Sequence, residues 1–268
     1  MSETGQNKSE FNPGKPILFI SDVHIGGFSK SKEQYIEQDL LSLIDYADNN
    51  GYAICVLGDL FDFWMEYPNK RPSIGKKVLD RFARFNKKNT SSLYITGNHD
   101  NWVYNYFEKC GFDVDGEYRI LKIENKSVLL MHGDGVEDEF LELPRPYFHR
   151  ILRNPKFVFI FRHLLPPSLG IATTKWFSRF NRTFNEKSEK ECTPFIDDWA
   201  KRMLAEQKFD VIICGHHHYP RFINVNNGLY INLGNFFNDR TLAIYNNEGF
   251  QLVKWHGLNQ KIERLYPL

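Results

Sequence analysis

The chain has few cysteines and no long apolar run, and each shortage excludes a class of protein. Its 268 residues contain four cysteines, none of them in a Cys-x-x-Cys pair. We therefore expect neither a disulfide framework nor a cysteine zinc site, and a reducing compartment fits best. No stretch approaches the roughly 18 uninterrupted apolar residues that a membrane-spanning helix requires. The sequence thus predicts no transmembrane segment.

The first fifteen residues lack the apolar core of a secretion signal. They read MSETGQNKSEFNPGK and are polar throughout, whereas an export signal carries an apolar stretch. We expect residues 1–15 to form a flexible tail and the protein to remain in the cytoplasm.

The chain also lacks a strong net charge. The formal charge is +1 at neutral pH, which argues against a general nucleic-acid binder. The charge is unevenly distributed, because segment 142–190 holds ten Lys or Arg against three Glu. The remainder must then be acidic, as expected if the carboxylates of a metal site lie there.

Short apolar runs recur along the chain and predict strands. They lie at 17–20, 53–57, 92–96, 127–131, 211–214 and 229–233, with further candidates at 242–245 and 251–255. Helical patterns at 32–49 and 73–88 lie between the early strands, and this alternation indicates an α/β layered fold. The later strands follow one another closely and favour antiparallel additions. We expect a mixed sheet or a two-sheet sandwich, flanked by helices.

Segment 140–205 interrupts this alternation. It combines prolines, basic residues and aromatics, and it contains no clear strand pattern. We interpret it as a helical insertion, or cap, over the functional site. The core would then consist of residues 16–139 and 206–268.

Polar clusters follow the ends of successive predicted strands, where open α/β sheets bind their ligands. If these strands are neighbours, seven side chains converge: Asp22, His24, Asp59, Asn98, His132, His216 and His218. Imidazole, carboxylate and amide groups together suit Mn, Fe, Co or Zn. Seven ligands are too many for one tetrahedral ion. They fit two ions that share a carboxylate, the arrangement that serves displacement at phosphorus.

Each cluster also has a structural explanation when it is taken alone. Asp22, His24 and Asp59 are of types common in caps and turns, and Gly97-Asn98 suits the left-handed backbone of a turn. The histidine tract 216–218 would also fit a surface loop. The order of five clusters, each at the end of a strand, is what favours a two-metal site. The remaining histidines (His149, His163, His217 and His256) are expected in surface or packing roles.

The ordered motifs Asp-x-His, Gly-Asp, Gly-Asn-His-Asp, His-Gly and Gly-His-x-His resemble those of the calcineurin-like metallophosphoesterases, over nearly the whole chain. The resemblance implies a four-layer αββα sandwich and a two-metal phosphoesterase. One ion would take Asp22, His24, Asp59 and His218, and the other Asp59, Asn98, His132 and His216, so that Asp59 bridges them. His99 would contact the scissile phosphate or the leaving oxygen, and Asp100 would orient His99.

Within that family the chain is most similar to the UDP-2,3-diacylglucosamine pyrophosphatases of lipid A biosynthesis. The matching stretches are 21–25, 57–64, 147–148 and 153–155. The resemblance implies release of UMP and 2,3-diacylglucosamine 1-phosphate, with Mn²⁺ as the first choice of metal and Zn²⁺, Fe²⁺ or Co²⁺ as alternatives. It also implies a peripheral position on the cytoplasmic face of the inner membrane of a Gram-negative-type bacterium. The candidate substrate-binding residues are Asn98, His99, Arg153, Lys175, Arg179 and Arg182.

The composition of segment 142–190 supports a lipid substrate separately. Its basic groups would hold a diphosphate or an anionic membrane surface, and its nine aromatics would line a slot for acyl chains. The alternative is a pair of amphipathic helices packed on the core, with the Lys and Arg side chains in solvent.

Position 99 keeps other functions open. The subgroup carries Arg where this chain has His99, and a histidine can donate a proton to an alcohol leaving group. The first alternative is therefore a soluble calcineurin-like phosphodiesterase or nucleotide phosphatase with another substrate. A metal-free binding scaffold of the same fold and a nuclease whose aromatics stack on single strands are the other two.

Overall fold

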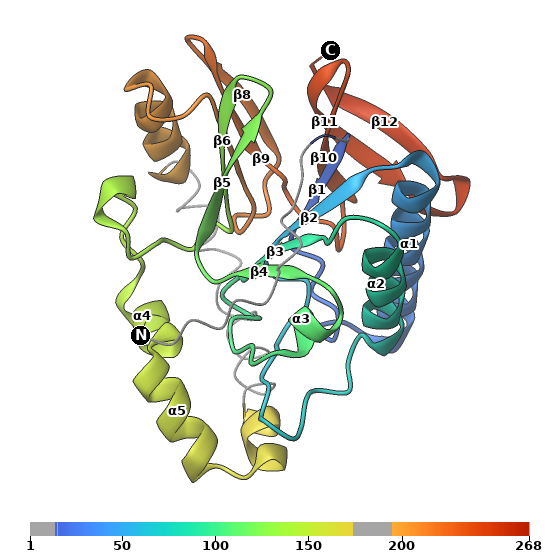
Figure 1. Cartoon of the computed structure of the whole chain (residues 1–268), viewed down its shortest axis with the longest axis vertical. Coiled ribbons are helices and arrows are strands. Elements are labelled where there is room, and N and C mark those ends of the chain that lie inside the picture. The colour runs from blue at the N-terminus through green and yellow to red at the C-terminus, as the bar shows by residue number, and fades with distance from the viewer. Residues whose placement is uncertain (1–13, 15, 174–194, 268) are drawn as a thin grey trace.

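The computed structural model describes residue 14 and residues 16–173 and 195–267. Its strands form two sheets (Figure 1). In order across the seven-stranded sheet these are β12 (Lys261–Tyr266), β11 (Gly249–His256), β10 (Thr241–Asn246), β1 (Ile17–Ile20), β2 (Ala53–Leu57), β3 (Leu93–Ile95) and β4 (Asp113–Asp115). The five-stranded sheet has the order β5 (Tyr118–Ile123), β6 (Lys126–Met131), β7 (Val211–Cys214), β9 (Gly228–Asn232) and β8 (Arg221–Val225).

The alternation of side chains along each strand explains how the two sheets stack. Successive side chains of a strand point to opposite faces. In β1, Ile17 and Phe19 pack between the two sheets, whereas Leu18 and Ile20 pack against helices. Those helices are α1 (Lys30–Asn50) and α2 (Lys76–Lys88), which lie side by side on the outer face (Figure 1).

The outer face of the five-stranded sheet is covered by helical residues 195–205. Ile196, Trp199 and Met203 of this helix are buried against side chains of β6, β7 and β9. The molecule therefore has four layers, helix, sheet, sheet and helix, and the predicted two-sheet α/β architecture is confirmed. One boundary is corrected, because residues 195–205 complete the core although we had assigned them to the insertion. Their apolar residues recur at helical spacing, so a whole face of the helix is buried.

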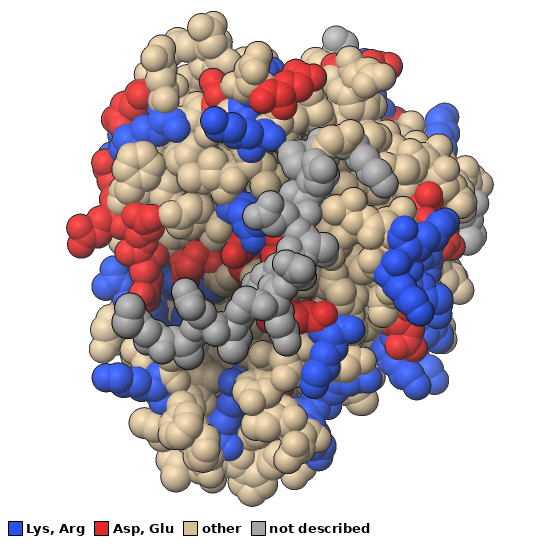
Figure 2. All heavy atoms as spheres, in the orientation of Figure 1, with Lys and Arg blue, Asp and Glu red and all other residues tan. Residues whose placement is uncertain are grey.

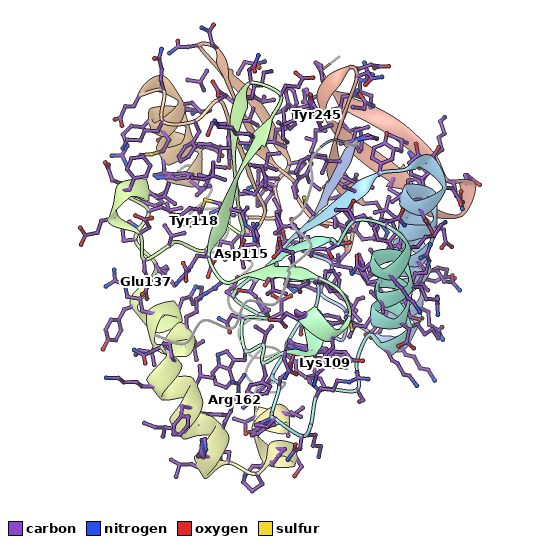
Figure 3. The ribbon with its side chains drawn as sticks, in the orientation of Figure 1. Lys109, Asp115, Tyr118, Glu137, Arg162 and Tyr245 are labelled. Atoms are coloured by element: carbon purple, nitrogen blue, oxygen red, sulfur yellow. The ribbon has the colours of Figure 1, made fainter. Side chains whose placement is uncertain are left out.

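The described part of the insertion lies at one end of the molecule (Figure 1). It contains α4 (Tyr147–Arg153), α5 (Pro155–Leu164) and helical residues 167–173, after the short turn η1 (Glu139–Leu141). Leu152, Phe157 and Phe161 pack against a small cluster formed by Met65, Tyr67 and Trp102. Arg162 of α5 donates to the main-chain oxygens of Trp102 and Val103 and so fixes the helix to the same loop (Figure 3).

Most predicted strands and helices are present at the predicted positions, and the strands that were not predicted have a common feature. The strands at 17–20, 53–57 and 211–214 have the predicted bounds. Four strands were not predicted (β4, β5, β8 and β12), nor were the short helices α3 (Tyr106–Lys109) and η2 (Gly257–Asn259). β4, β8 and β12 lie at sheet edges, and β5 alternates exposed with buried residues. None of them contains the long apolar run that marks a central strand.

The sequence predicted neither a transmembrane helix nor a disulfide framework. Within the described ranges, no helix has the length and apolar character needed to span a bilayer. Cys55, Cys110 and Cys214 are buried free thiols, and Cys192 lies outside the described residues. So does the predicted tail, apart from residue 14.

Candidate metal centre

The loops that follow the strands adopt a backbone conformation that side chains disfavour. Asp22, His24, Asp59, His216 and His218 all have positive φ, between 52° and 71°. Such left-handed backbone costs a non-glycine residue on the order of 1–3 kcal/mol and persists where the surrounding structure enforces it, typically at functional sites. Five of the seven predicted ligands therefore occupy strained positions.

Two glycines allow the strand ends to approach one another closely. A Cβ atom on Gly97 would lie 2.0 Å from Asp59 Oδ1. A Cβ atom on Gly58, whose φ is +82°, would lie 2.5 Å from His132 Nδ1 and 2.7 Å from the Cα atom of Gly97. Any larger residue at these positions would push the ligand loops apart.

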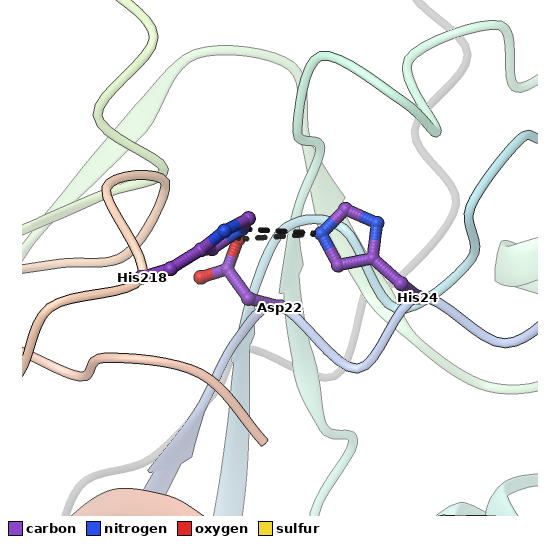
Figure 4. Close-up of side chains that lie close together, drawn as sticks. All are labelled: Asp22, His24 and His218. Atoms are coloured by element: carbon purple, nitrogen blue, oxygen red, sulfur yellow. Dashed lines mark hydrogen bonds and ion pairs between the residues drawn. The ribbon is translucent and has the colours of Figure 1, made fainter. Parts of the chain in front are cut away.

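A first group of ligands forms where β1 and β7 end (Figure 4). Asp22, His24 and His218 come from segments nearly two hundred residues apart, and their candidate ligand atoms all lie within 4.8 Å of one another. His218 Nε2 lies 3.3 Å from both His24 Nε2 and Asp22 Oδ1. Three lone-pair donors aimed at one point are the arrangement that a cation requires.

A second group lies beside the first, and its Asp59 also faces His24 of the first group. His132 Nε2 is 3.4 Å from Asp59 Oδ2 and 3.0 Å from Asn98 Oδ1. The same Asp59 oxygen lies 3.8 Å from His24 Nε2, in the first group. The His216 ring is 5.0 Å from the His132 ring, between centroids. The structure thus brings all seven predicted ligands together, with Asp59 between the two groups.

Hydrogen bonds fix the orientation of several ligands. His132 Nδ1 donates to the Leu57 carbonyl at 2.8 Å, which leaves Nε2 directed at Asp59. The main-chain N–H groups of His216 and His99 donate to Asp22 Oδ2 and Asp59 Oδ1. The bond at Nδ1 selects the tautomer of His132 and holds its ring in place for a metal, and the main-chain bonds hold the two carboxylates.

The electrostatics of the site favour bound cations. Although burial opposes ionisation, the nearby rings of His218 and His24 hold the pKa of Asp22 below its ordinary value. Burial lowers the pKa of His132, but the charge and hydrogen bond of Asp59, together with the charges of Asp22 and Asp134, raise it to about 10. Asp22 Oδ1 is buried and has no hydrogen-bond donor. Ionised carboxylates, an oxygen without a donor and converging imidazoles together fit divalent metal ions.

His99 lies beside the ligands and is oriented differently from our expectation. Its Nδ1 donates to the Asp62 carbonyl at 2.7 Å, and its ring lies 4.9 Å from that of His24. Asp100 instead accepts from the Tyr94 hydroxyl and from main-chain N–H groups. Asp100 therefore fixes the loop, and the hydrogen bond that orients His99 comes from residue 62.

Asp62 is a residue of the site that the ligand prediction missed. Its Oδ1 lies 3.4 Å from His24 Nδ1, and its main chain holds His99. The signal was present in the segment 57–64, which follows the Gly-Asp motif, but a main-chain contact leaves no trace in residue type. His149 of α4 was also set aside, and its ring lies 6.4 Å from that of His216.

The structure shows which groups Arg153 contacts within the chain. Its guanidinium contacts both carboxylate oxygens of Asp134 and donates to the main-chain oxygens of Thr96 and Gly116. Burial works against ionised Asp134, but the charge of Arg153, with those of His132, Arg145 and His216, lowers the pKa of Asp134 to about 2. Arg153 thus joins α4 to the loops that precede Asn98 and follow His132, and its assignment to substrate binding stays a prediction. Lys175, Arg179 and Arg182 lie outside the described residues.

Comparison with known protein families gives the same result as the geometry. The family model of the calcineurin-like phosphoesterases matches residues 15–220. The chain belongs to this family. Together with the ligand groups, membership makes it a metal-dependent hydrolase of phosphate bonds, and it confirms the resemblance found in the motifs.

Individual relatives and one solved structure are similar to this chain over most of its length. A UDP-2,3-diacylglucosamine hydrolase of Blochmanniella pennsylvanica is 27% identical over 94% of this chain and 97% of its own length. The Coxiella burnetii protein of the same name is 26% identical over 76% of this chain and 80% of its own length. Among solved structures, a phosphoesterase from E. coli is similar with a TM-score of 0.45 and 16% identity, over 92% of this chain and 96% of that one.

Proposed function

We propose that this chain uses two divalent ions to hydrolyse the pyrophosphate bond of UDP-2,3-diacylglucosamine, releasing UMP and 2,3-diacylglucosamine 1-phosphate. The observation that carries the proposal is the pair of ligand groups joined by Asp59, whose Oδ2 lies 3.4 Å from His132 Nε2 and 3.8 Å from His24 Nε2. The choice of substrate is supported by the two curated relatives of that name, which match most of the chain.

The ligands divide into two sets. One ion would be held by Asp22, His24, Asp59 and His218, and the other by Asp59, Asn98, His132 and His216. Mn²⁺ is our first choice, with Zn²⁺, Fe²⁺ and Co²⁺ as alternatives, because borderline divalent metals all accept this ligand set. Bound there, the ions would supply an activated water and would neutralise charge on the phosphate oxygens.

His99 is the residue that we assign to the leaving group. Because its Nδ1 donates to the Asp62 carbonyl, its Nε2 is the nitrogen left for a substrate. Protonated Nε2 would donate a hydrogen bond to the departing oxygen and stabilise the charge that develops there. Burial lowers the pKa of His99, while the nearby carboxylate of Asp59 opposes that effect. The substrate's own charge would then decide whether the ring is protonated.

The insertion supplies surface suited to the lipid half of the substrate. Residues 143–173 contain no Asp or Glu, and α5 has no buried residue. Phe159, Ile160, Leu164 and Leu169 are more than half exposed. In Figure 2, tan and blue atoms predominate at the lower end of the molecule, where Figure 1 shows α5. Apolar side chains next to Arg150 and Lys156 suit an acyl chain and an anionic membrane surface. We propose peripheral contact with that surface.

The alternative is a phosphodiesterase or nucleotide phosphatase with a water-soluble substrate. It is favoured by one feature, the histidine at position 99, because expulsion of an alcohol gains from a proton donor and expulsion of a phosphate does not require one.

The two functions are separated by substrate and product. We expect the Mn²⁺-loaded protein to release UMP from UDP-2,3-diacylglucosamine dispersed in detergent, faster than it cleaves a simple aryl phosphodiester. The control is the Asp59→Ala variant, purified and loaded in the same way. Rapid cleavage of the aryl diester without release of UMP would reject the lipid substrate and establish the alternative.

A further inference from the structure

Two aromatic rings stand beside the first group of ligands, outside the motifs that define the site. Phe237, in the loop between β9 and β10, meets the rings of His24 and His218 edge-on, with centroids 5.6 and 5.1 Å apart. Phe28, just before α1, lies 5.2 Å from Phe237 at an interplanar angle of 34°. Both phenylalanines are half-buried, so part of each ring faces solvent.

A lysine completes this surface. Lys32 Nζ lies 4.2 Å from the centroid of Phe28 and 5.4 Å from that of Phe237, and it donates to Asn238 Oδ1 at 2.5 Å. Its charge is thus held against two aromatic faces. We refer to Phe28, Lys32 and Phe237 as the aromatic shelf. Through Phe237, the shelf contacts the rings of two candidate metal ligands, His24 and His218.

The insertion approaches the site on the side of the second ligand group, which contains His132 and His216. Its His149 is near His216, and its Arg153 holds Asp134, two residues beyond His132. The shelf instead touches His24 and His218. A substrate with two arms joined at a diphosphate would therefore meet apolar and basic surface beside one ligand group and the shelf beside the other.

We infer that the aromatic shelf binds the base of the nucleotide arm. This inference rests on the proposed function, since it assumes that the substrate has a nucleoside on one side of the scissile phosphate. A planar base offers a π-face for stacking on half-exposed phenylalanines. Its ring carbonyls offer acceptors to the Lys32 ammonium, which has three donors. The shelf would thus distinguish a nucleotide from other phosphates.

Two ligands that differ only by the base test this role. UMP and ribose 5-phosphate share the phosphate and the sugar, so the ratio of their dissociation constants reports the base alone. We expect the full-length Mn²⁺-loaded protein to bind UMP about tenfold more tightly in calorimetry, as one stacked base would provide. In Phe28→Leu and Lys32→Met the ratio should fall towards one, with the affinity for ribose 5-phosphate unchanged.

A matched control is available on the same helix. Lys30 is exposed and two residues away from Lys32, so Lys30→Met removes the same charge and should keep the ratio of the wild type. A ratio near one in the wild type, or an unchanged ratio in both shelf variants, would overturn the inference. Loss of ribose 5-phosphate affinity in those variants would overturn it as well, because the shelf would then only support the ligands.

The outcome is independent of the lipid assay. If UMP is released from the lipid substrate but the ratio is one, the inference about the shelf fails and the proposed function stands. If the ratio is tenfold and depends on the shelf but no UMP is released, the lipid substrate fails and the nucleotide subsite stands.

Discussion

At the residue scale, a few side chains hold the site together, and Asp59 is the one that connects its two halves. It has a positive φ of 53°, its Oδ2 faces both His24 and His132, and its Oδ1 accepts from the main chain of His99. Its carboxylate fits beside residue 97 only because glycine has no Cβ atom. The residue proposed to bridge the two ions therefore also has a strained backbone conformation.

The first prediction concerns the bridging role of Asp59. Asp59→Ala should lower kcat by about 10³-fold or more, because the stabilisation lost with the metals amounts to several kcal/mol. Metal analysis after gel filtration should find both ions lost, since each set uses this carboxylate. Asp45→Asn, which changes an exposed carboxylate on α1, should retain metal and activity. Near-normal turnover of metal-replete Asp59→Ala would show that the residue does not bridge.

A second prediction separates the two functions of His99. His99→Gln keeps a hydrogen-bonding side chain but removes the transferable proton. We expect hydrolysis of a phenyl phosphodiester to slow by about 10²-fold, the usual contribution of a general acid. Hydrolysis of the p-nitrophenyl analogue should slow far less, because p-nitrophenolate leaves without a proton. The measurement is kcat for both esters in both proteins. An equal loss would mean that His99 acts through charge or position and not by proton donation.

At the element scale, charged side chains join the two helices that cover the seven-stranded sheet. Asp48 near the end of α1 accepts from Lys88 and Arg81 of α2 and from Asn89 at its C-cap. The hydrogen bond from Lys88 contributes most to lowering the pKa of Asp48 from the ordinary 3.8 to about 2. A carboxyl group whose pKa is depressed on folding stabilises the folded state above its ordinary pKa. That contribution disappears as pH falls towards 2.

The third prediction follows from the lowered pKa of Asp48. Asp48→Asn should lower the free energy of unfolding by about 1 kcal/mol at pH 7, a value reduced for the solvent screening of Lys88. The difference from the wild type should shrink between pH 4 and pH 2. Urea unfolding at several pH values measures it. Asp198→Asn, in an exposed pair with Lys201, serves as the control and should change stability little. A constant difference at every pH would contradict an ionic origin.

The elements also show what the sequence could and could not predict. Central strands such as β1, β2 and β7 were predicted to the residue, because burial on both faces leaves a continuous apolar run. β12, with the sequence KIERLY, was missed because it is a mostly exposed edge strand. The convergence of the seven candidate ligands was predictable because each follows the end of a strand. The hydrogen bonds of His99 to the main chain of Asp62, and of Arg153 to the main chains of Thr96 and Gly116, were not, since any residue carries a main-chain oxygen.

At the scale of the whole molecule, the uneven charge seen in the sequence corresponds to a division in space. The ligand groups concentrate carboxylates at the edge of the two sheets, whereas residues 143–173 of the insertion contain no acidic residue. Its α5 helix extends from the core and is anchored through one side, by Phe157, Phe161 and Arg162. Phe159 and Ile160 face away from that side, and Leu164 at the end of the helix is exposed as well. A phosphoesterase for a lipid substrate would place these exposed side chains against the membrane, with the metal groups behind them.

The last prediction tests that arrangement with the full-length protein. It should sediment with vesicles containing anionic lipid more strongly than with neutral vesicles, and less at high salt, because the attraction to Arg150 and Lys156 is screened. Phe159→Ser and Leu164→Ser should each weaken the binding about tenfold, the scale expected when a buried apolar side chain is removed. Tyr35→Ser is the control, because Tyr35 is 66% exposed on α1, a helix that covers the seven-stranded sheet and is not part of the insertion. If all three variants bound like the wild type, α5 would not be the surface that meets the lipid, and the apolar side chains on it would need another partner.

If instead the two α5 variants lost vesicle binding but still released UMP from detergent-dispersed substrate, membrane contact and catalysis would be separable properties of one chain. The insertion would then serve to bring the metal groups to the membrane.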